Sequence, residues 1–175
     1  MSDTASSTTS EVSTSATTTT GIDTTDTNPL TRCEPPPVAD TPSVTLGPSD
    51  GVEAIQAALD AAVAGDVIGL EDGTYDLDRQ SLTLRTPGVT LAGMSGEASA
   101  VVFDANLGST VGIRVQASDT TLRAITLVDP FFEGVVVAPP EDTTRGLTGV
   151  VIDRVHVINP GRVGILAQSD VSGLY

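Results

Sequence analysis

The 175-residue chain has no lysine or tryptophan, and only one histidine and one cysteine. Its net charge is −15, from 23 acidic residues and eight arginines. Nucleic acids and anionic membrane surfaces are bound through basic patches, so both partner classes are disfavoured. Only 3% of the residues are aromatic, which argues against an aromatic platform for sugars.

Cys33, the single cysteine, excludes a disulfide framework and a cysteine metal site within the chain, and whether it pairs outside the chain stays open. No run of 18 apolar residues is present, so we expect no membrane span. Phosphate loops, dinucleotide fingerprints and serine-nucleophile elbows are also missing, and we expect no cofactor of those kinds.

The N-terminal part differs in composition from the rest of the chain. Ser and Thr make up 18 of the first 31 residues, and "CEPPPVADTPSVTLGP" follows. We predict a disordered Ser/Thr/Pro-rich linker over residues 1–45 and one folded domain over residues 46–175. Stalks of this kind separate a surface domain from its anchor. We therefore interpret Met1 as an internal start with a secretion signal upstream, and predict an extracellular or cell-surface protein; the alternative is a cytoplasmic protein with a polar tail.

The segment "SDGVEAIQAALDAAVAGD" predicts a helix, with Ser49 or Asp50 capping its first turn and Gly65 ending it. Its apolar face comprises Val52, Ile55, Leu59 and Val63. After it, "VIGLEDGTY" predicts a short buried strand and an Asp-Gly turn.

Short apolar runs separated by Gly, Asp, Asn, Ser and Pro then continue to the end of the chain. "ITLVDPFFEGVVV" (125–137) and "VHVINPGRVGILA" (155–167) share one pattern. The alignment pairs Asp129-Pro130 with Asn159-Pro160, Gly134 with Gly164, Leu122 with Ile152 and Leu127 with Val157. Repeats of 20 to 30 residues with only short strands indicate a parallel β-helix. An antiparallel sandwich is the alternative.

Stacking of equivalent positions predicts which side chains face inward. The inward sets are Ile113, Val135 and Ile165; Ile125 and Val155; and Leu127 and Val157. The outward sets are Arg114, Val136 and Leu166, and Thr126 and His156. We expect the glycines and the Asp/Asn-Pro pairs at corners, and the helix over the first strand edges. "QSDVSGLY" stops where another repeat would begin, so we expect a truncated chain, or an end covered by an oligomer or partner.

The segments "AIQAALDAAVAGDVIGLEDGTYDL", "SLTLRTPGVTLAG" and "VVFDAN" resemble the opening of right-handed parallel β-helix proteins of the pectate-lyase-like superfamily. The resemblance covers about residues 50–175. It implies an all-β, right-handed parallel β-helix (solenoid) of about four coils with an N-terminal capping α-helix. The superfamily contains secreted polysaccharide lyases, hydrolases, esterases and epimerases. The likeness is greatest to bacterial surface β-helix repeat proteins of no known activity.

A uronate lyase or epimerase needs Ca²⁺ or arginine to neutralise a carboxylate, and a base beside it. The candidate catalytic residues are Asp153, Arg154, His156, Arg123 and Asp129. The alternative is a cross-strand ion pair between Arg123 and Asp153 on a solvated face, with His156 an ordinary surface residue.

A hydrolase site is disfavoured because no Asp-Asp pair occurs. "EDGTYDLD" (71–78) superficially suggests calcium but lacks the EF-hand spacing, so Ca²⁺ is expected only for a lyase. Our first prediction is a surface protein that binds a carbohydrate or partner without a catalytic set. The alternatives are a uronate-polymer lyase or epimerase whose catalytic coils are partly missing, and a structural spacer.

Overall fold

The computed structural model describes residues 41–175, except 142–145 and 169–170. Most of the predicted linker, with Cys33, lies outside the described residues. The last two linker positions, Val44 and Thr45, instead begin the first strand, β1.

The predicted helix is present but shorter than expected. Helix α1 spans Gly51–Ala61 and buries Val52, Ile55 and Leu59. Val63, the fourth residue of the predicted apolar face, is 65% exposed, and the prediction that the helix extends to Gly65 is wrong. A turn replaces the last helical residues, because the Asp66 carboxylate accepts a hydrogen bond from the Val63 backbone N–H at 2.8 Å.

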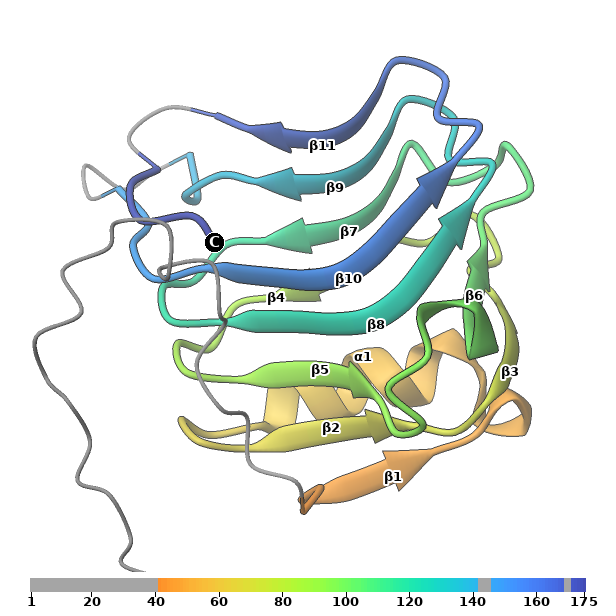
Figure 1. Ribbon diagram of the computed structural model, residues 1–175, viewed down its shortest axis with the longest axis horizontal. Coiled ribbons are helices and arrows are strands. Elements are labelled where there is room, and N and C mark those ends of the chain that lie inside the picture. The colour runs from red at the N-terminus through yellow and green to blue at the C-terminus, as the bar shows by residue number, and fades with distance from the viewer. Residues whose placement is uncertain (1–40, 142–145, 169–170) are drawn as a thin grey trace, which may run out of the picture. The chain divides into compact units, whose positions relative to one another are not determined.

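Parallel strands rich in Val, Ile and Leu make up most of the rest, since branched side chains pack well on a half-buried pleated surface. Seven strands form one sheet in the order β1-β2-β5-β8-β6-β3, with β10 also pairing with β8; four form a second sheet in the order β11-β9-β7-β4 (Figure 1). The strands are β1 (Val44–Leu46), β2 (Val67–Leu70), β3 (Gly73–Asp76), β4 (Leu82–Leu84), β5 (Thr90–Gly93), β6 (Val101–Asp104), β7 (Val111–Val115), β8 (Thr121–Val128), β9 (Glu133–Val137), β10 (Val151–Ile158) and β11 (Val163–Ala167).

The prediction of an all-β right-handed parallel β-helix of about four coils is wrong. The described residues form two parallel sheets with a helix, in a mixed α/β-like arrangement rather than a clearly closed solenoid. One reason is the length of β8, which pairs with β5 through Thr121–Arg123 and with β6 through Thr126–Val128. In a solenoid, β5 and β6 would lie on separate faces. Here β8 joins both of them into one sheet.

Helix α1 contributes to the interior as well as covering strand edges. It packs against β1, β2, β3 and β4, and its buried face belongs to the same apolar core as both sheets. The core therefore combines helix and sheet residues, which an all-β description omits.

The predicted register between repeats is confirmed. Strand β10 lies parallel to β8 with Ile152 beside Leu122, Val155 beside Ile125 and Val157 beside Leu127. In the second sheet Ile113, Val135 and Ile165 are consecutive partners. Ile113 and Val135 are fully buried, whereas Ile165 is 40% exposed, because β11 is an outer strand of the described sheet.

Two side chains predicted to face outward from the sheets are buried. Val136 is 4% exposed, and Thr126 is also 4% exposed. A short 3-10 helix, η3 (Ala98–Ala100), packs on β8, and the Thr126 hydroxyl donates a hydrogen bond to the Ala98 carbonyl oxygen at 2.8 Å. His156, beside Thr126 in the register, is exposed as predicted.

The repeated glycines lie inside strands, and the prediction that they occupy corners is wrong. Gly112, Gly134 and Gly164 are each the second residue of a strand in the second sheet. A Cβ on Gly134 would lie 2.7 Å from the Gly164 carbonyl oxygen and would also overlap Val157 Cγ1. Glycine is required at Gly134 because strand backbone and the partly buried Val157 side chain approach it closely.

We expect Gly134→Ala to lower the free energy of unfolding by about 1–3 kcal/mol, because the added methyl group overpacks this contact. Gly164→Ala is the matched control: its Cβ would meet Val157 Cβ at an ordinary 3.6 Å. The control should stay within about 1 kcal/mol of the parent. Urea denaturation measures both variants, and equal effects would contradict this account of the repeated glycine.

Candidate functional site

The parallel register of β8 and β10 places Arg123 directly beside Asp153. The Arg123 Nε donates a hydrogen bond to Asp153 Oδ2 at 2.8 Å, and the two side chains are 23% and 15% exposed. The predicted cross-strand ion pair is therefore present. It is more enclosed than a pair on a fully solvated face.

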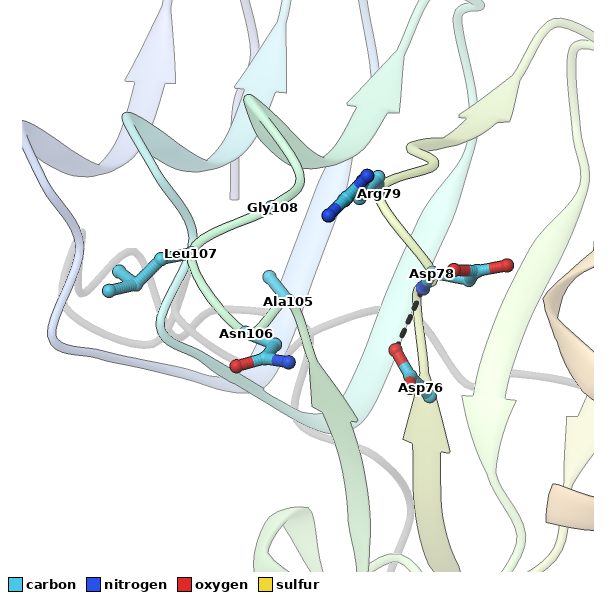
Figure 2. A pocket seen from close by; sticks show the side chains of 7 residues that line it. All are labelled: Asp76, Asp78, Arg79, Ala105, Asn106, Leu107 and Gly108. Atoms are coloured by element: carbon cyan, nitrogen blue, oxygen red, sulfur yellow. Dashed lines mark hydrogen bonds between the residues drawn. The ribbon is translucent and has the colours of Figure 1, made fainter.

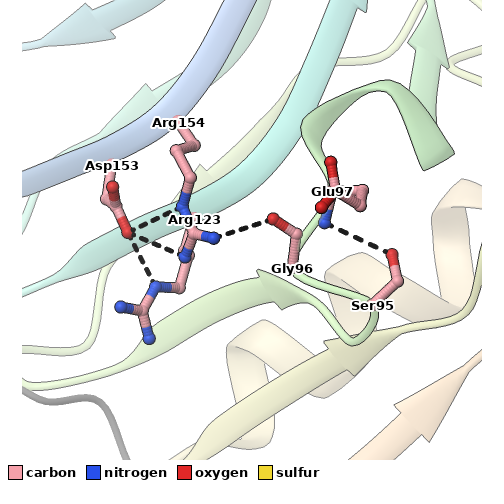
Figure 3. A network of polar contacts seen from close by, with 6 residues as sticks. All are labelled: Ser95, Gly96, Glu97, Arg123, Asp153 and Arg154. Atoms are coloured by element: carbon pink, nitrogen blue, oxygen red, sulfur yellow. Dashed lines mark hydrogen bonds and ion pairs between the residues drawn. The ribbon is translucent and has the colours of Figure 1, made fainter.

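Arg154 binds the same carboxylate oxygen. Its Nε and Nη2 donate to Asp153 Oδ2 at 3.3 and 3.1 Å, and its Nη1 donates to the Gly96 carbonyl oxygen at 2.9 Å (Figure 3). Arg154 has a φ of 50°, in the left-handed region, as does Ala124, the residue after Arg123 on β8. The local change of backbone direction puts consecutive residues Asp153 and Arg154 within reach of each other.

This network, which we call the Asp153 cluster (Arg123, Asp153, Arg154 and the Gly96 carbonyl), fastens a loop to the sheet. Gly96 lies between β5 and η3, and that segment crosses the part of β8 where Thr126 is buried. The cluster therefore has an evident structural task, which is to hold this connection against β8 and β10.

The charge state of Asp153 follows from its surroundings. Partial burial by itself raises the pKa of the carboxyl group. The hydrogen bonds and charges of Arg123 and Arg154 act in the opposite direction and prevail, so the pKa lies below its ordinary value. A carboxylate with a lowered pKa is a weak general base near neutral pH.

The other two predicted site residues lie outside the cluster. His156 is exposed on β10, and within the described residues no hydrogen bond or ion pair joins it to Asp153 or either arginine. Asp129 lies at the turn after β8, where its Oδ1 accepts a hydrogen bond from Asn159 Nδ2 at 3.2 Å. Asp129 and Asn159 both have a φ of 51°, a conformation that Asp and Asn adopt more readily than most residues.

The part of the chain that the structure describes contains no group of three or more His, Cys, Asp or Glu side chains able to hold a metal ion. That includes the acidic segment "EDGTYDLD". The described residues also contain no helix with the length and apolar character needed to cross a membrane.

Sequence reasoning missed a surface cavity of about 360 Å³ at the turns that follow β3 and β6 (Figure 2). It is lined by Asp76, Asp78, Arg79, Ala105, Asn106, Leu107 and Gly108. Asp76 Oδ1 accepts a hydrogen bond from the Asp78 backbone N–H at 2.8 Å. The Arg79 stem lies close to Gly108, where a Cβ would meet Arg79 Cγ at 2.7 Å.

Sequence reasoning also missed an exposed pair of aromatic side chains. Phe131 and Phe132, directly after the turn at Asp129, are 49% and 37% exposed, with ring centroids 4.5 Å apart. The available signal was "DPFFEG": two of the three phenylalanines in the chain stand together directly after a predicted turn.

Comparisons of the chain with protein-family models, with curated proteins and with solved structures find no match. The resemblance to the pectate-lyase-like superfamily therefore stays a prediction from the residues that carry it.

We expect Asp153→Asn to lower the free energy of unfolding at pH 7 by about 1.5–3 kcal/mol, because the arginines lose hydrogen bonds to a charged partner. The Asp153 pKa is lowered in the folded state, so its contribution is complete above the ordinary value of 3.8 and is lost as pH falls through the lowered value. Urea denaturation between pH 7 and pH 2 should show the difference between parent and variant shrinking below about pH 4.

Asp60→Asn is the matched control for this prediction. Asp60 pairs with Arg85 at 3.1 Å, but both side chains are more than half exposed. Its loss should cost less than about 1 kcal/mol. A difference for Asp153→Asn that grows as the pH falls would mean that the carboxyl pKa is raised.

Proposed function

We propose that this chain is an extracellular or cell-surface binding protein that recognises a carbohydrate or macromolecular partner without transforming it. The observation that carries the proposal is the engagement of the Asp153 cluster: Arg123 and Arg154 both donate to one oxygen of Asp153. The residues best suited to uronate chemistry are already bound to one another.

β-Elimination from a uronate requires a cation at the substrate carboxylate, a base at the neighbouring carbon and an acid at the leaving oxygen. Moving either arginine to a substrate would take a hydrogen bond from Asp153, which is only 15% exposed, at a cost of about 1–3 kcal/mol. His156 could act as a base, but no described arginine is bonded to it. The geometry thus supports a structural task for the cluster more strongly than a catalytic one.

The proposed extracellular location rests on the amino-acid composition of the chain. A Ser/Thr-rich N-terminal segment and a net charge of −15 suit a soluble domain displayed outside the cell. Binding rests on the exposed side chains at the turns, Leu107, Phe131 and Phe132, because large apolar groups gathered on a surface are typical of interaction sites.

The test is incubation of the full chain with pectate, alginate, hyaluronan and chondroitin, with and without Ca²⁺, while absorbance near 232 nm reports the unsaturated product of β-elimination. We expect no increase on any polymer. Affinity electrophoresis through gels containing the same polymers measures binding separately from turnover.

Variants decide the meaning of any turnover that is found. Arg154→Ala and His156→Ala change the candidate residues, and Arg85→Ala is the control, since Arg85 belongs to an exposed ion pair outside the cluster. A calcium-dependent increase lost in the first two variants but kept in the control would make the protein a lyase and overturn the proposal.

A further inference from the structure

We propose that the exposed turn surface formed by Leu107, Phe131 and Phe132 binds a segment of a partner protein that carries a large apolar side chain beside lysine or arginine. We call these three residues the turn surface. The inference rests on the proposed binding function and specifies the chemistry of the partner.

The three side chains come from neighbouring turns joined by backbone hydrogen bonds. The Leu107 N–H donates to the Asp129 carbonyl oxygen at 2.9 Å, and the Phe131 N–H donates to the Ser109 carbonyl oxygen at 2.9 Å. The Phe132 N–H donates to the Thr110 carbonyl oxygen at 3.1 Å. The backbone under the turn surface is therefore held in place before any partner arrives, which reduces the entropy lost on binding.

Two adjacent exposed phenylalanines distinguish the turn surface from single exposed aliphatic side chains elsewhere, such as Val63 and Met94. Of its three phenylalanines, Phe103 is fully buried beside Tyr75, with ring centroids 5.1 Å apart, while the other two lie in the turn surface. Leu107 is the most exposed of the set, at 60%. Aromatic side chains are enriched where proteins contact other proteins, and burying the two phenylalanines with Leu107 supplies the apolar part of an interface.

Acidic groups border the turn surface on the side of the cavity. Leu107, Asp76 and Asp78 all line the cavity, and Figure 2 shows the Leu107 side chain on the side of its turn that faces away from the two aspartates. Asp104 is the register partner of Asp76. Asp129 lies in the same turn as the phenylalanines. Among the described residues, none of these four aspartates forms an ion pair with an arginine.

The arginines near this region do not neutralise those aspartates. Arg162 Nη1 pairs with Glu133 Oε1 at 3.0 Å, and its guanidinium lies 5.7 Å from the centre of the Phe132 ring. Arg79 lines the cavity but makes no ion pair with any described acidic side chain. Like charges on neighbouring strands, as at Asp76 and Asp104, repel one another, and a cationic partner would relieve that repulsion.

Charge selects the partner among the possible occupants. A second copy of this chain would bring together two molecules of net charge −15, and a uronate polymer would also be repelled. A neutral glycan could contact the rings but would leave the acidic border uncompensated. A basic and apolar protein segment satisfies both parts of the surface, with its apolar group on the rings and its cation beside Asp76 and Asp78.

The experiment is an NMR titration of the ¹⁵N-labelled full chain with the peptide acetyl-Arg-Leu-Arg-Leu-amide. We expect saturable shifts of backbone amides in residues 76–79, 104–108 and 129–132, weakening as salt is added. Acetyl-Glu-Leu-Glu-Leu-amide and methyl β-galactoside are the control probes, and neither should produce saturable shifts there.

Two variants test the apolar and acidic parts separately. Phe131→Ser and Asp78→Asn should each weaken peptide binding at least threefold. Val63→Ser and Glu97→Gln are the matched controls, because Val63 is 65% exposed and Glu97 is an exposed acid outside the turn surface. The controls should bind like the parent, and near-parental far-UV circular dichroism should show that all four variants fold.

The proposal is overturned if the basic peptide gives no saturable shifts, if either control probe shifts the same amides to the same extent, or if Phe131→Ser binds like the parent. Light scattering that shows a dimer lost in Phe131→Ser would assign the surface to a second copy and also overturn it. These outcomes are separate from polymer turnover, so a failed titration with no absorbance change would leave the proposed binding function standing.

Discussion

The parallel pairing of β10 with β8, offset by 30 residues, is the constraint on which the rest of the structure depends. It stacks the partly buried Val155 and Val157 on the fully buried Ile125 and Leu127 of the apolar core, and it sets Asp153 beside Arg123 on the other face. The same offset brings the turn at Asn159 over the turn at Asp129. A slip of one residue in the pairing of β10 with β8 would turn the inward side chains outward. Burial of the apolar side chains therefore also fixes the positions of Arg123 and Asp153.

The Asp153 cluster follows from that pairing together with a local bend. Ala124 and Arg154 both adopt left-handed backbone conformations within their strands. Beyond the bend β8 pairs with β6, and the connection from β5 to β6 must cross it, where Arg154 binds Gly96. The Asp153 cluster thus secures a crossing loop against the sheet.

Repeat alignment could predict the register, the inward side chains and the Arg123–Asp153 pair, because identical spacing in successive repeats is a local property of the sequence. It could not predict how the strands combine into sheets, since the left-handed conformations of Ala124 and Arg154, neither a glycine, leave no signal. Burial of Thr126 depends on a distant loop, and the helix end at Ala61 depends on the Asp66 carboxylate. The hydrophobicity of Phe131 and Phe132 predicts that they are buried. Their exposure depends on their position at the stacked turns, which the sequence alone does not reveal.

The central claim is that Asp153 holds two arginines in a structural cluster, leaving recognition to the turns. The most direct measurement is the titration of the Asp153 carboxyl carbon by ¹³C NMR in the full chain. The account predicts a pKa below the ordinary value of 3.8, with the Nε–H signals of Arg123 and Arg154 shifting as that carboxylate is protonated. A pKa at or above 3.8, with neither arginine responding, would mean that the cluster does not form and that the arginines are free for chemistry.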